Sequence, residues 1–463
     1  MKRKKLDFTV PVLGEPLVDS PIASTKQGCV FHTCFIDEDQ HVLYEIETNG
    51  STANTDLSKG NILEKAGPRR KIYFDPSKVN AGIVTCGGLC PGLNDVIRAI
   101  VMCLWYRYEV KRICGFRYGY RGFLPQYGLP IMELTPDKVT NIHRQGGTIL
   151  GSSRGHGDCV DEIVDSLERM NINVLFTVGG DGTQKGALDI SNEARKRGLR
   201  IAVIGIPKTI DNDLSFVQKT FGFETAVSQA VEAVAAAHVE ASDAVNGIAL
   251  VKVMGRDSGF IAAHTALAIN DVNFVLIPEE SFDLEGGNGL MANLQRRLER
   301  RGHAVILVAE GAGQNLMESS QATDASGNKK YGDIGIFLKD QISAHFKKQQ
   351  IDINLKYIDP SYMIRSAPAN PNDSIYCARL GAHAVHAALA GKTGIIISLV
   401  HNHFVHVPIS MAVAQRKCID PEKDLWRDVT EATGQPLLLR ERRHKPRGKG
   451  NKSEKLVEEV ASV

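Results

Sequence analysis

The chain has 463 residues, of which 43% are hydrophobic and 23% are charged, so it is long enough for two or three globular domains. A net charge of +2 gives no reason to expect nucleic acid or an anionic membrane as the main partner. No run of about 18 apolar residues is present, so we expect no transmembrane helix. Nine cysteines without framework spacing indicate reduced thiols, and the basic start lacks the apolar core of a secretory signal, so we expect a cytoplasmic protein.

The two ends of the chain differ from its middle. Residues 1–78 mix prolines with a Gly/Ser/Asn patch, which predicts an N-terminal extension that wraps the body. Residues 416–463 are expected to form a C-terminal extension. Its Lys/Arg-rich stretch, residues 440–455, indicates a solvated tail.

The middle of the chain alternates short apolar runs with helical patterns. Continuous β-branched runs are typical of strands covered on both faces, and strands that alternate with helices predict an α/β fold with a mostly parallel sheet. The expected strands are 81–85, 174–178, 201–206, 247–253, 274–277, 304–308 and 394–399. The clearest expected helices are 92–104, 183–197, 225–241, 289–301 and 375–390.

Glycine-rich polar turns follow three of these strands, where ligands bind in such sheets. The first turn, residues 85–94, contains Gly87 and Gly88. Without Cβ atoms the backbone can approach an anion there, and the next helix offers free N–H groups. A purely structural tight turn is the alternative.

The second turn, residues 179–183, has the sequence Gly-Gly-Asp-Gly-Thr. Asp181, at the end of a strand and before a helix, suits a Mg²⁺ ion that bridges phosphate oxygens. Gly182 keeps the adjacent space open, and Thr183 and Gly186 can cap the helix or contact phosphate. An ordinary turn or cap role for Asp181 is the alternative.

The third turn, residues 207–213, has the sequence Pro-Lys-Thr-Ile-Asp-Asn-Asp. Asp211 and Asp213 would point the same way if this segment were extended. Adjacent like charges are unfavourable unless a metal or substrate compensates them. One carboxylate can then act as a base toward a hydroxyl while the other supports the metal.

Phosphoryl transfer also requires fixed positive charge. Arg154, Arg256 and Arg365 are candidates because they stand among glycines or in apolar segments after strands. An ordinary surface position is the alternative for any single arginine.

Together these segments resemble the 6-phosphofructokinase family over about residues 79–413. Residues 179–187, 207–214 and 357–365 are most similar to the trypanosomatid and plant ATP-dependent enzymes, a branch related to the pyrophosphate-dependent ones. The resemblance implies a cytoplasmic glycolytic enzyme that transfers the γ-phosphoryl group of MgATP to the C1 hydroxyl of fructose 6-phosphate. It also implies a homotetramer, with a dimer as the alternative, and allosteric regulation.

The resemblance implies two Rossmann-like, mostly parallel α/β domains with the active site in the cleft between them. The nucleotide-binding domain would comprise residues 79–222, with 364–415 returning to it, and the sugar-phosphate domain residues 223–363.

By the same resemblance, Asp211 is the general base toward the sugar hydroxyl, flanked by Thr209 and Asp213, while Asp181 faces Mg²⁺ and Arg256 steadies the developing charge. Positions that match those lining the nucleotide are Gly88, Tyr120, Arg154, Gly182, Thr183, Gly186 and Lys208. Positions that match those around the sugar phosphate are Thr209, Asp211, Met254, Gly255, Arg256, Glu310, Lys356, Tyr362 and Arg365.

The chain departs from the short bacterial pattern in its sugar-phosphate clamp. Gly247 and Lys356 stand where that pattern has arginines that cross a subunit interface, and Tyr362 replaces a histidine. In a homotetramer Lys356 would reach a neighbour's site.

Donor choice rests on two positions. Gly182 is the residue of ATP users, because an aspartate there obstructs the nucleotide in pyrophosphate users, whereas Lys208 is of the pyrophosphate type. We therefore expect ATP, with a pyrophosphate-dependent enzyme as the alternative.

Two other classes of protein share features with this sequence. NAD kinases and diacylglycerol-type kinases share the Gly-Gly-Asp-Gly-Thr motif but lack segments 207–213 and 357–365. A non-catalytic regulatory subunit on the same fold would be expected to lose Asp181, Asp211 or Arg256, and all three are present.

Overall fold

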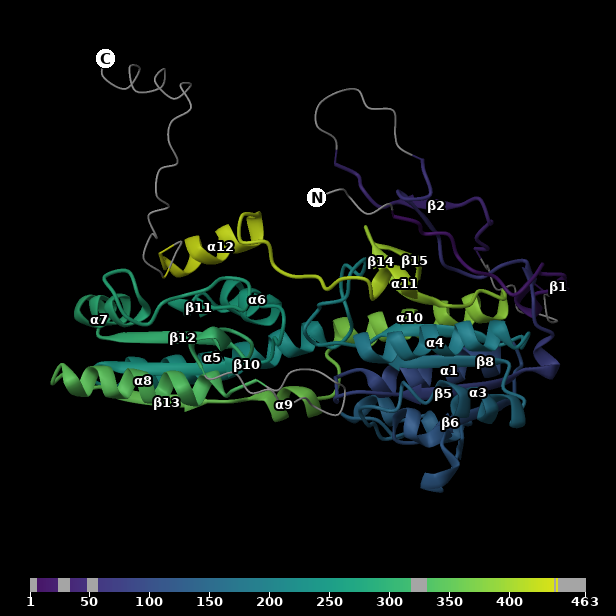
Figure 1. The fold of residues 1–463 in the computed structure, drawn as a ribbon, viewed down its shortest axis with the longest axis horizontal. Helices are drawn as coiled ribbons and strands as arrows, with labels where there is room; N and C mark the ends of the chain where they lie inside the picture. Colours follow the sequence, from purple (N-terminus) through teal and green to yellow (C-terminus); the bar gives the residue numbers. More distant parts are fainter. Residues whose placement is uncertain (1–5, 24–33, 48–56, 318–330, 437–438, 440–463) are drawn as a thin grey trace, which may run out of the picture.

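The computed structural model describes residues 6–23, 34–47, 57–317, 331–436 and 439. These residues form two α/β domains, each built on its own sheet, which lie side by side along the long axis of the molecule (Figure 1). The mostly parallel α/β fold expected from the sequence is confirmed.

The first domain contains a seven-stranded sheet. In spatial order its strands are β15 (His403–Pro408), β14 (Ile395–Val400), β9 (Ala202–Pro207), β8 (Val174–Gly179), β5 (Asn80–Thr85), β6 (Arg112–Phe116) and β7 (Met132–Glu133). The five inner strands are parallel, and the edge strands β15 and β7 run antiparallel to their neighbours. Every residue of β8 and β9 is buried, as expected for strands covered on both faces.

The second domain contains a four-stranded parallel sheet. Its strands, in spatial order, are β11 (Phe274–Leu276), β12 (His303–Ala309), β10 (Gly247–Val253) and β13 (Asn354–Ile358). Along β10, Ala249 and Val251 join one apolar cluster while Ile248 and Leu250 join another, so both faces of this sheet are covered. Strand β13 was not predicted, because it is a half-exposed edge strand without a continuous apolar run.

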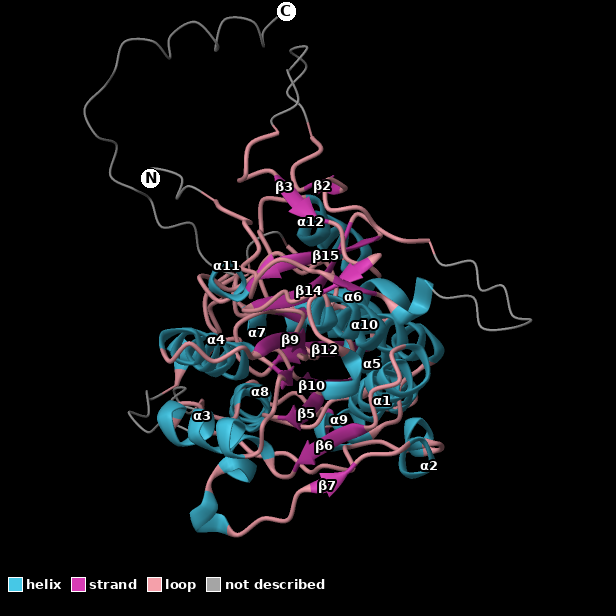
Figure 2. Cartoon of the chain, turned by 90° about the vertical axis from the view of Figure 1, so that its right-hand side faces the viewer, coloured by secondary structure: helices cyan, strands magenta, loops and turns pink. Residues whose placement is uncertain are grey.

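Twelve α-helices surround the sheets in the described part of the chain. They are α1 (Leu93–Arg107), α2 (Pro136–Val139), α3 (Val160–Arg169), α4 (Asp181–Lys196), α5 (Phe223–Ser242), α6 (Phe260–Ile269), α7 (Leu290–Arg301), α8 (Ile334–Lys348), α9 (Ser361–Ser366), α10 (Pro371–Leu389), α11 (Ile409–Ala412) and α12 (Asp424–Thr433). Helices α3 and α4 lie on one face of the larger sheet, and α1 and α10 lie on the other (Figure 2). None of the described helices is long and apolar enough to cross a membrane.

The described part of the N-terminal extension packs on the first domain. Two short antiparallel pairs shape it, β1 (Val18–Asp19) with β4 (Lys71–Ile72) and β2 (His41–Leu43) with β3 (Ile62–Glu64). Lys65 forms a β-bridge with Val405 of β15, and Val12 forms one with Lys392. The extension therefore rests on the last two strands of the larger sheet and the turn that leads into them.

A buried ionic network holds the extension in place. Glu64 Oε1 lies 3.0 Å from Arg69 Nη2, 2.9 Å from Lys392 Nζ and 3.0 Å from His406 Nδ1. Glu38 pairs with the same Arg69 and Lys392 at 2.9 Å and 2.8 Å. Burial alone would raise the pKa of Glu64, but His406 and Lys392 outweigh it and hold this pKa well below its usual range.

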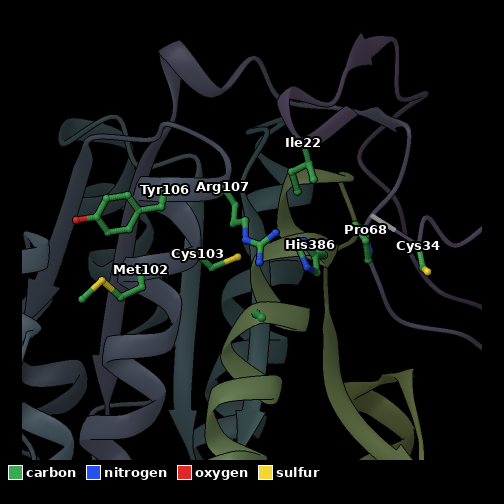
Figure 3. Close-up of a pocket in the computed structure, with 9 residues that line it drawn as sticks. Ile22, Cys34, Pro68, Met102, Cys103, Tyr106, Arg107 and His386 are labelled. Carbon is green, nitrogen blue, oxygen red and sulfur yellow. The ribbon is translucent and has the colours of Figure 1, made fainter. Parts of the chain in front are cut away.

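A cavity of about 500 Å³ opens between the extension and the helices α1 and α10. Figure 3 shows Arg107 of α1 and His386 of α10 facing it, with Ile22 and Pro68 of the extension on the other side. Its lining contains none of the residues that the sequence singles out for chemistry.

Residues 413–423, here named the crossing segment, lead from the first domain back to the second (Figure 1). The segment forms a β-bridge between Arg416 and Leu214, and the N–H group of Lys417 donates to the carbonyl of Asp213 at 2.9 Å. Helix α12 then packs against α6 and β11 of the second domain. The basic tail predicted at residues 440–455 lies outside the described residues.

Candidate active site

The three predicted glycine-rich or acidic turns meet at one edge of the larger sheet. Strands β5, β8 and β9 are parallel neighbours, so their carboxyl ends lie together. Backbone hydrogen bonds join the turns: Cys86 N–H donates to the carbonyl of Val178, and Lys208 N–H donates to the carbonyl of Gly179. The edge at which α/β sheets bind ligands thus carries all three motifs.

The third turn is not extended, so the prediction that Asp211 and Asp213 point the same way along an extended segment is wrong. Residues 210–211 form a turn, and Asn212 adopts a left-handed conformation with φ 55°. Thr209 organises the turn, because its Oγ1 accepts from the Asp211 N–H group at 3.1 Å and donates to Asp213 Oδ1 at 3.0 Å. The two carboxylates are still close enough for the charge of Asp213 to perturb Asp211.

Asp211 is partly buried, and its buried Oδ1 atom has no hydrogen-bond partner among the described residues. Burial, together with the charges of Asp213 and Glu310, raises its pKa to about 7, while Arg365 and the backbone N–H group of Arg256 act in the opposite direction. A carboxylate that exchanges a proton near neutral pH and has a free oxygen is suited to general-base chemistry.

Asp181 is the first residue of α4, where a carboxylate is favoured by the helix dipole. Its Oδ2 lies 2.8 Å from Lys185 Nζ and 3.8 Å from Arg416 Nη2. Arg416 Nη1 lies 3.5 Å from Asp213 Oδ2 and also contacts Asp257 Oδ2. The guanidinium of Arg416 therefore stands among carboxylates from three segments of the chain.

Sequence reasoning missed Arg416 and Asp257. Asp257 directly follows Arg256, a position that could have drawn attention to it. Arg416 lies in the crossing segment without a glycine-rich turn beside it, so none of the motifs used above includes it.

The carboxylates suit a nucleotide-bound magnesium ion better than an all-protein metal site. No group of three or more His, Cys, Asp or Glu side chains in the described ranges is arranged to hold a metal. Asp181 and Asp213 nevertheless face one common cation, the Arg416 guanidinium, so a cationic position exists between them. Mg²⁺ usually takes one or two carboxylates together with phosphate oxygens and water, and these residues fit that requirement.

Three basic side chains surround the first turn. Lys208 is buried, and its Nζ donates to the carbonyl of Gly88 at 2.7 Å. A Cβ atom added to Gly88 would lie 3.4 Å from Arg365 Nη1 and 3.6 Å from Arg154 Nη2. Burial, with the charges of Arg365 and Arg154, lowers the pKa of Lys208. Three cations so close together need an anion, and a phosphate group satisfies that need.

The predicted nucleotide positions Gly182 and Gly186 in α4 differ in the free space beside them. A Cβ atom on Gly182 would meet no atom within 4 Å, so the space beside it is open. A Cβ atom on Gly186 would lie 2.9 Å from the ring of Tyr120. Tyr120 is buried and its hydroxyl donates to the carbonyl of Thr183 at 2.7 Å. The hydrogen bond between Tyr120 and Thr183 therefore stabilises the first turn of α4.

The predicted sugar-phosphate positions of β10 and β12 lie together. Met254 is buried, and Gly255 has φ 128°, a conformation that disfavours other residues. The N–H group of Glu310 donates to the carbonyl of Val253, which aligns the ends of the two strands. The guanidinium of Arg256 lies 4.7 Å from the ring centre of Tyr331.

Lys356 and Tyr362 are the two remaining predicted sugar-phosphate positions on β13 and α9. Lys356 lies on the edge strand β13 with its Nζ 4.0 Å from Glu240 Oε2, and Tyr362 of α9 is 88% exposed. Gly247, where the short bacterial pattern has arginine, has no space for a side chain, because its Cβ atom would lie 2.0 Å from the carbonyl oxygen of Ala241.

Two α/β domains, strand-end carboxylates around a cation position, a carboxyl group with a raised pKa and a cluster of basic side chains are features expected of a phosphotransferase. The phosphofructokinase family model matches residues 80–388, more than half of the chain. The chain therefore belongs to the phosphofructokinase family, as the sequence motifs indicated.

Individual relatives agree with this assignment. The chain is 55% identical over 449 residues to the ATP-dependent 6-phosphofructokinase of Borreliella burgdorferi, a match that covers 95% of this chain and 99% of the relative. It is 48% identical over 423 residues to that of Trypanosoma brucei brucei, covering 90% and 86%. This confirms the resemblance to the trypanosomatid branch.

A solved structure shares the fold. The pyrophosphate-dependent phosphofructokinase of Marinobacter aquaeolei superposes with a TM-score of 0.63 at 21% identity, covering 78% of this chain and 91% of that one. At this identity the likeness concerns the fold alone.

Proposed function

We propose that this phosphofructokinase transfers the γ-phosphoryl group of ATP to the C1 hydroxyl of fructose 6-phosphate, with fructose 1,6-bisphosphate and ADP as products. The observation that carries the proposal is the partly buried Asp211, whose Oδ1 has no hydrogen-bond partner among the described residues and whose pKa is raised to about 7 by burial and by the charges of Asp213 and Glu310. The names of relatives that span nearly the whole chain support the same reaction.

In this proposal Asp211 accepts the proton of the C1 hydroxyl as the hydroxyl oxygen attacks phosphorus. Removal of the proton in the transition state makes the oxygen a better nucleophile. Thr209 holds the turn through its hydrogen bonds to the Asp211 N–H group and to Asp213, so the base stays aligned. Arg256, whose backbone N–H group bonds Asp211, would steady the charge that develops on the transferred group.

The nucleotide would lie over the first and second turns. Magnesium, held by Asp181 and supported by Asp213, would neutralise negative charge on the phosphate oxygens. Lys208, Arg154 and the backbone at Gly88 would bind phosphate. The open space beside Gly182 leaves room for a nucleotide, which favours ATP over pyrophosphate as the donor.

The sugar phosphate would bind in the cleft between the domains. The contacts would come from Met254, Gly255, Arg256, Glu310 and Arg365, with Lys356 and Tyr362 near the sugar phosphate of the same or a neighbouring subunit. The Lys356 role requires an assembly, so a homotetramer is part of the proposal, as is a cytoplasmic location.

The test is a coupled assay of the purified chain with fructose 6-phosphate and either ATP or pyrophosphate. We expect turnover with MgATP, loss of turnover on chelation of magnesium, and little or no turnover with pyrophosphate. Turnover with pyrophosphate alone would reverse the donor assignment, and no turnover with either donor would favour a regulatory subunit.

A further inference from the structure

Arg416 lies where the metal-facing carboxylates converge, yet it belongs to none of the three turns. Its side chain is 32% exposed, and those of Asp181 and Asp213 are 16% and 11% exposed. Its Nη2 lies 3.8 Å from Asp181 Oδ2 and its Nη1 lies 3.5 Å from Asp213 Oδ2, while Nη1 also contacts Asp257 Oδ2. The planar guanidinium thus spans the gap between the first two carboxylates.

A second cation cannot share this gap. Mg²⁺ binds carboxylate oxygens at about 2.0–2.1 Å, so an ion that touches Asp181 and Asp213 would displace the guanidinium or repel it strongly. We propose that Arg416 is an internal counter-cation, which occupies Asp181 and Asp213 in the metal-free protein and competes with the divalent ion for them. This inference rests on the proposed function, in which these two aspartates face magnesium.

Asp257 can remain paired with Arg416 after the divalent ion displaces the guanidinium. It contacts Arg416 through Oδ2, and its Oδ1 accepts a hydrogen bond from the hydroxyl of Tyr331 at 3.0 Å, which fixes the carboxylate in position. Arg416 can therefore turn away from Asp181 and Asp213 while it keeps its pairing with Asp257.

The backbone of the crossing segment limits this movement to the side chain. The N–H group of Lys417 donates to the carbonyl of Asp213, and that of Ile419 donates to Glu279 Oε1 at 2.8 Å. The same Glu279 oxygen accepts from the Gly259 N–H group at 3.0 Å, so the segment is bound to both domains. The backbone on either side of Arg416 is therefore held beside the carboxylates, and only the Arg416 side chain is free to turn.

The test is Mn²⁺ binding to the nucleotide-free protein, measured by electron paramagnetic resonance of the free ion. We expect Arg416→Gln to bind Mn²⁺ roughly tenfold more tightly than the wild type, because one competing charge within about 4 Å is gone. Arg427→Gln is the matched control: Arg427, on α12, also pairs with aspartates, Asp424 and Asp428, so the change in charge is the same. Its Mn²⁺ affinity should equal that of the wild type.

Unchanged or weaker Mn²⁺ binding in Arg416→Gln, including no measurable binding in either protein, overturns the inference. Arg416→Lys keeps one charge but cannot reach both carboxylates with separate nitrogens, so it serves if the glutamine variant does not fold. We expect it to bind Mn²⁺ several-fold more tightly than the wild type, and an unchanged affinity would again contradict the proposal.

Asp181→Asn separates this inference from the proposed function. If Asp181→Asn weakens Mn²⁺ binding while the Arg416 variants behave as wild type, the counter-cation role alone is refuted. If Asp181→Asn leaves Mn²⁺ binding unchanged, the metal assignment within the proposed function is wrong, and the counter-cation role falls with it.

Discussion

Replacement of Asp211 by asparagine should make the protein more stable and nearly inactive. The wild-type Asp211 is partly buried, and its buried Oδ1 atom lacks a hydrogen-bond partner among the described residues. Its pKa lies at about 7 instead of the ordinary 3.8, with burial and the charges of Asp213 and Glu310 as causes. The folded state therefore binds the Asp211 proton more tightly than the unfolded state does.

The sign and size of the effect follow from this difference in pKa. Between about pH 4 and pH 7 the folded state holds more protons, so the free energy of unfolding falls as pH rises through this window. A pKa difference of about 3 units corresponds to roughly 4 kcal/mol, all of which is lost above about pH 7. Asparagine does not titrate, so Asp211→Asn should gain on the order of 4 kcal/mol over wild type at about pH 8 and less than half of this at about pH 5.

Differential scanning calorimetry of both proteins at the two pH values measures the effect on stability. Steady-state kinetics should show kcat lowered by about 10²–10⁴-fold, since the general base is absent. Wild-type kcat/KM should rise with pH up to about 7. An equal change in melting temperature at both pH values would refute the buried, proton-binding carboxylate, and near-wild-type turnover would refute its catalytic role.

Three further predictions follow from other contacts. Gly182→Asp should raise the KM for ATP by more than about 100-fold, because the aspartate side chain enters the open nucleotide space. The melting temperature of this variant should equal that of the wild type, because an acidic residue suits the first turn of a helix. Unchanged ATP kinetics would mean that the site is misplaced. Lys208→Gln should raise the KM for ATP by about tenfold or more, since a charge-assisted contact is lost, and equal KM values would exclude Lys208 from phosphate binding. Glu64→Gln should lower the free energy of unfolding by about 1–3 kcal/mol, because Lys392 and Arg69 lose one of their two carboxylate partners and keep only Glu38. The stability of the wild type should also fall as pH drops below about 4, because the unfolded state gains the Glu64 proton before the folded state does. Denaturation curves against pH that match for both proteins would contradict this.

The sequence predicted the parts of the fold that have strong local signals. Uninterrupted apolar runs identified buried strands such as β8 and β10, and glycines at their ends indicated the candidate site. Strand β13 was not predicted because its exposed edge removes the continuous apolar run. Local sequence patterns therefore predicted buried strands of both sheets but not the exposed edge strand β13.

The site was predicted as far as its residues belong to motifs. The placement of Asp181, Asp211 and Asp213 at neighbouring strand ends follows from parallel strand order, which the alternation of strands and helices predicts. The turn at Asn212 could not be read from spacing, since a left-handed residue reverses the direction expected of an extended chain. Arg416 comes from a segment some 200 residues from β9, so only the tertiary fold brings it to the carboxylates.

The order of strands in the two sheets has a consequence for synthesis on the ribosome. All strands of the smaller sheet come from one continuous stretch, residues 247–358, so this sheet can pair soon after it emerges. The larger sheet begins with β5 but needs β14 and β15, which are made only after all strands of the smaller sheet. The carboxyl ends of β5, β8 and β9 thus emerge early beside an open sheet edge, and the smaller sheet is expected to pair before the larger sheet is complete.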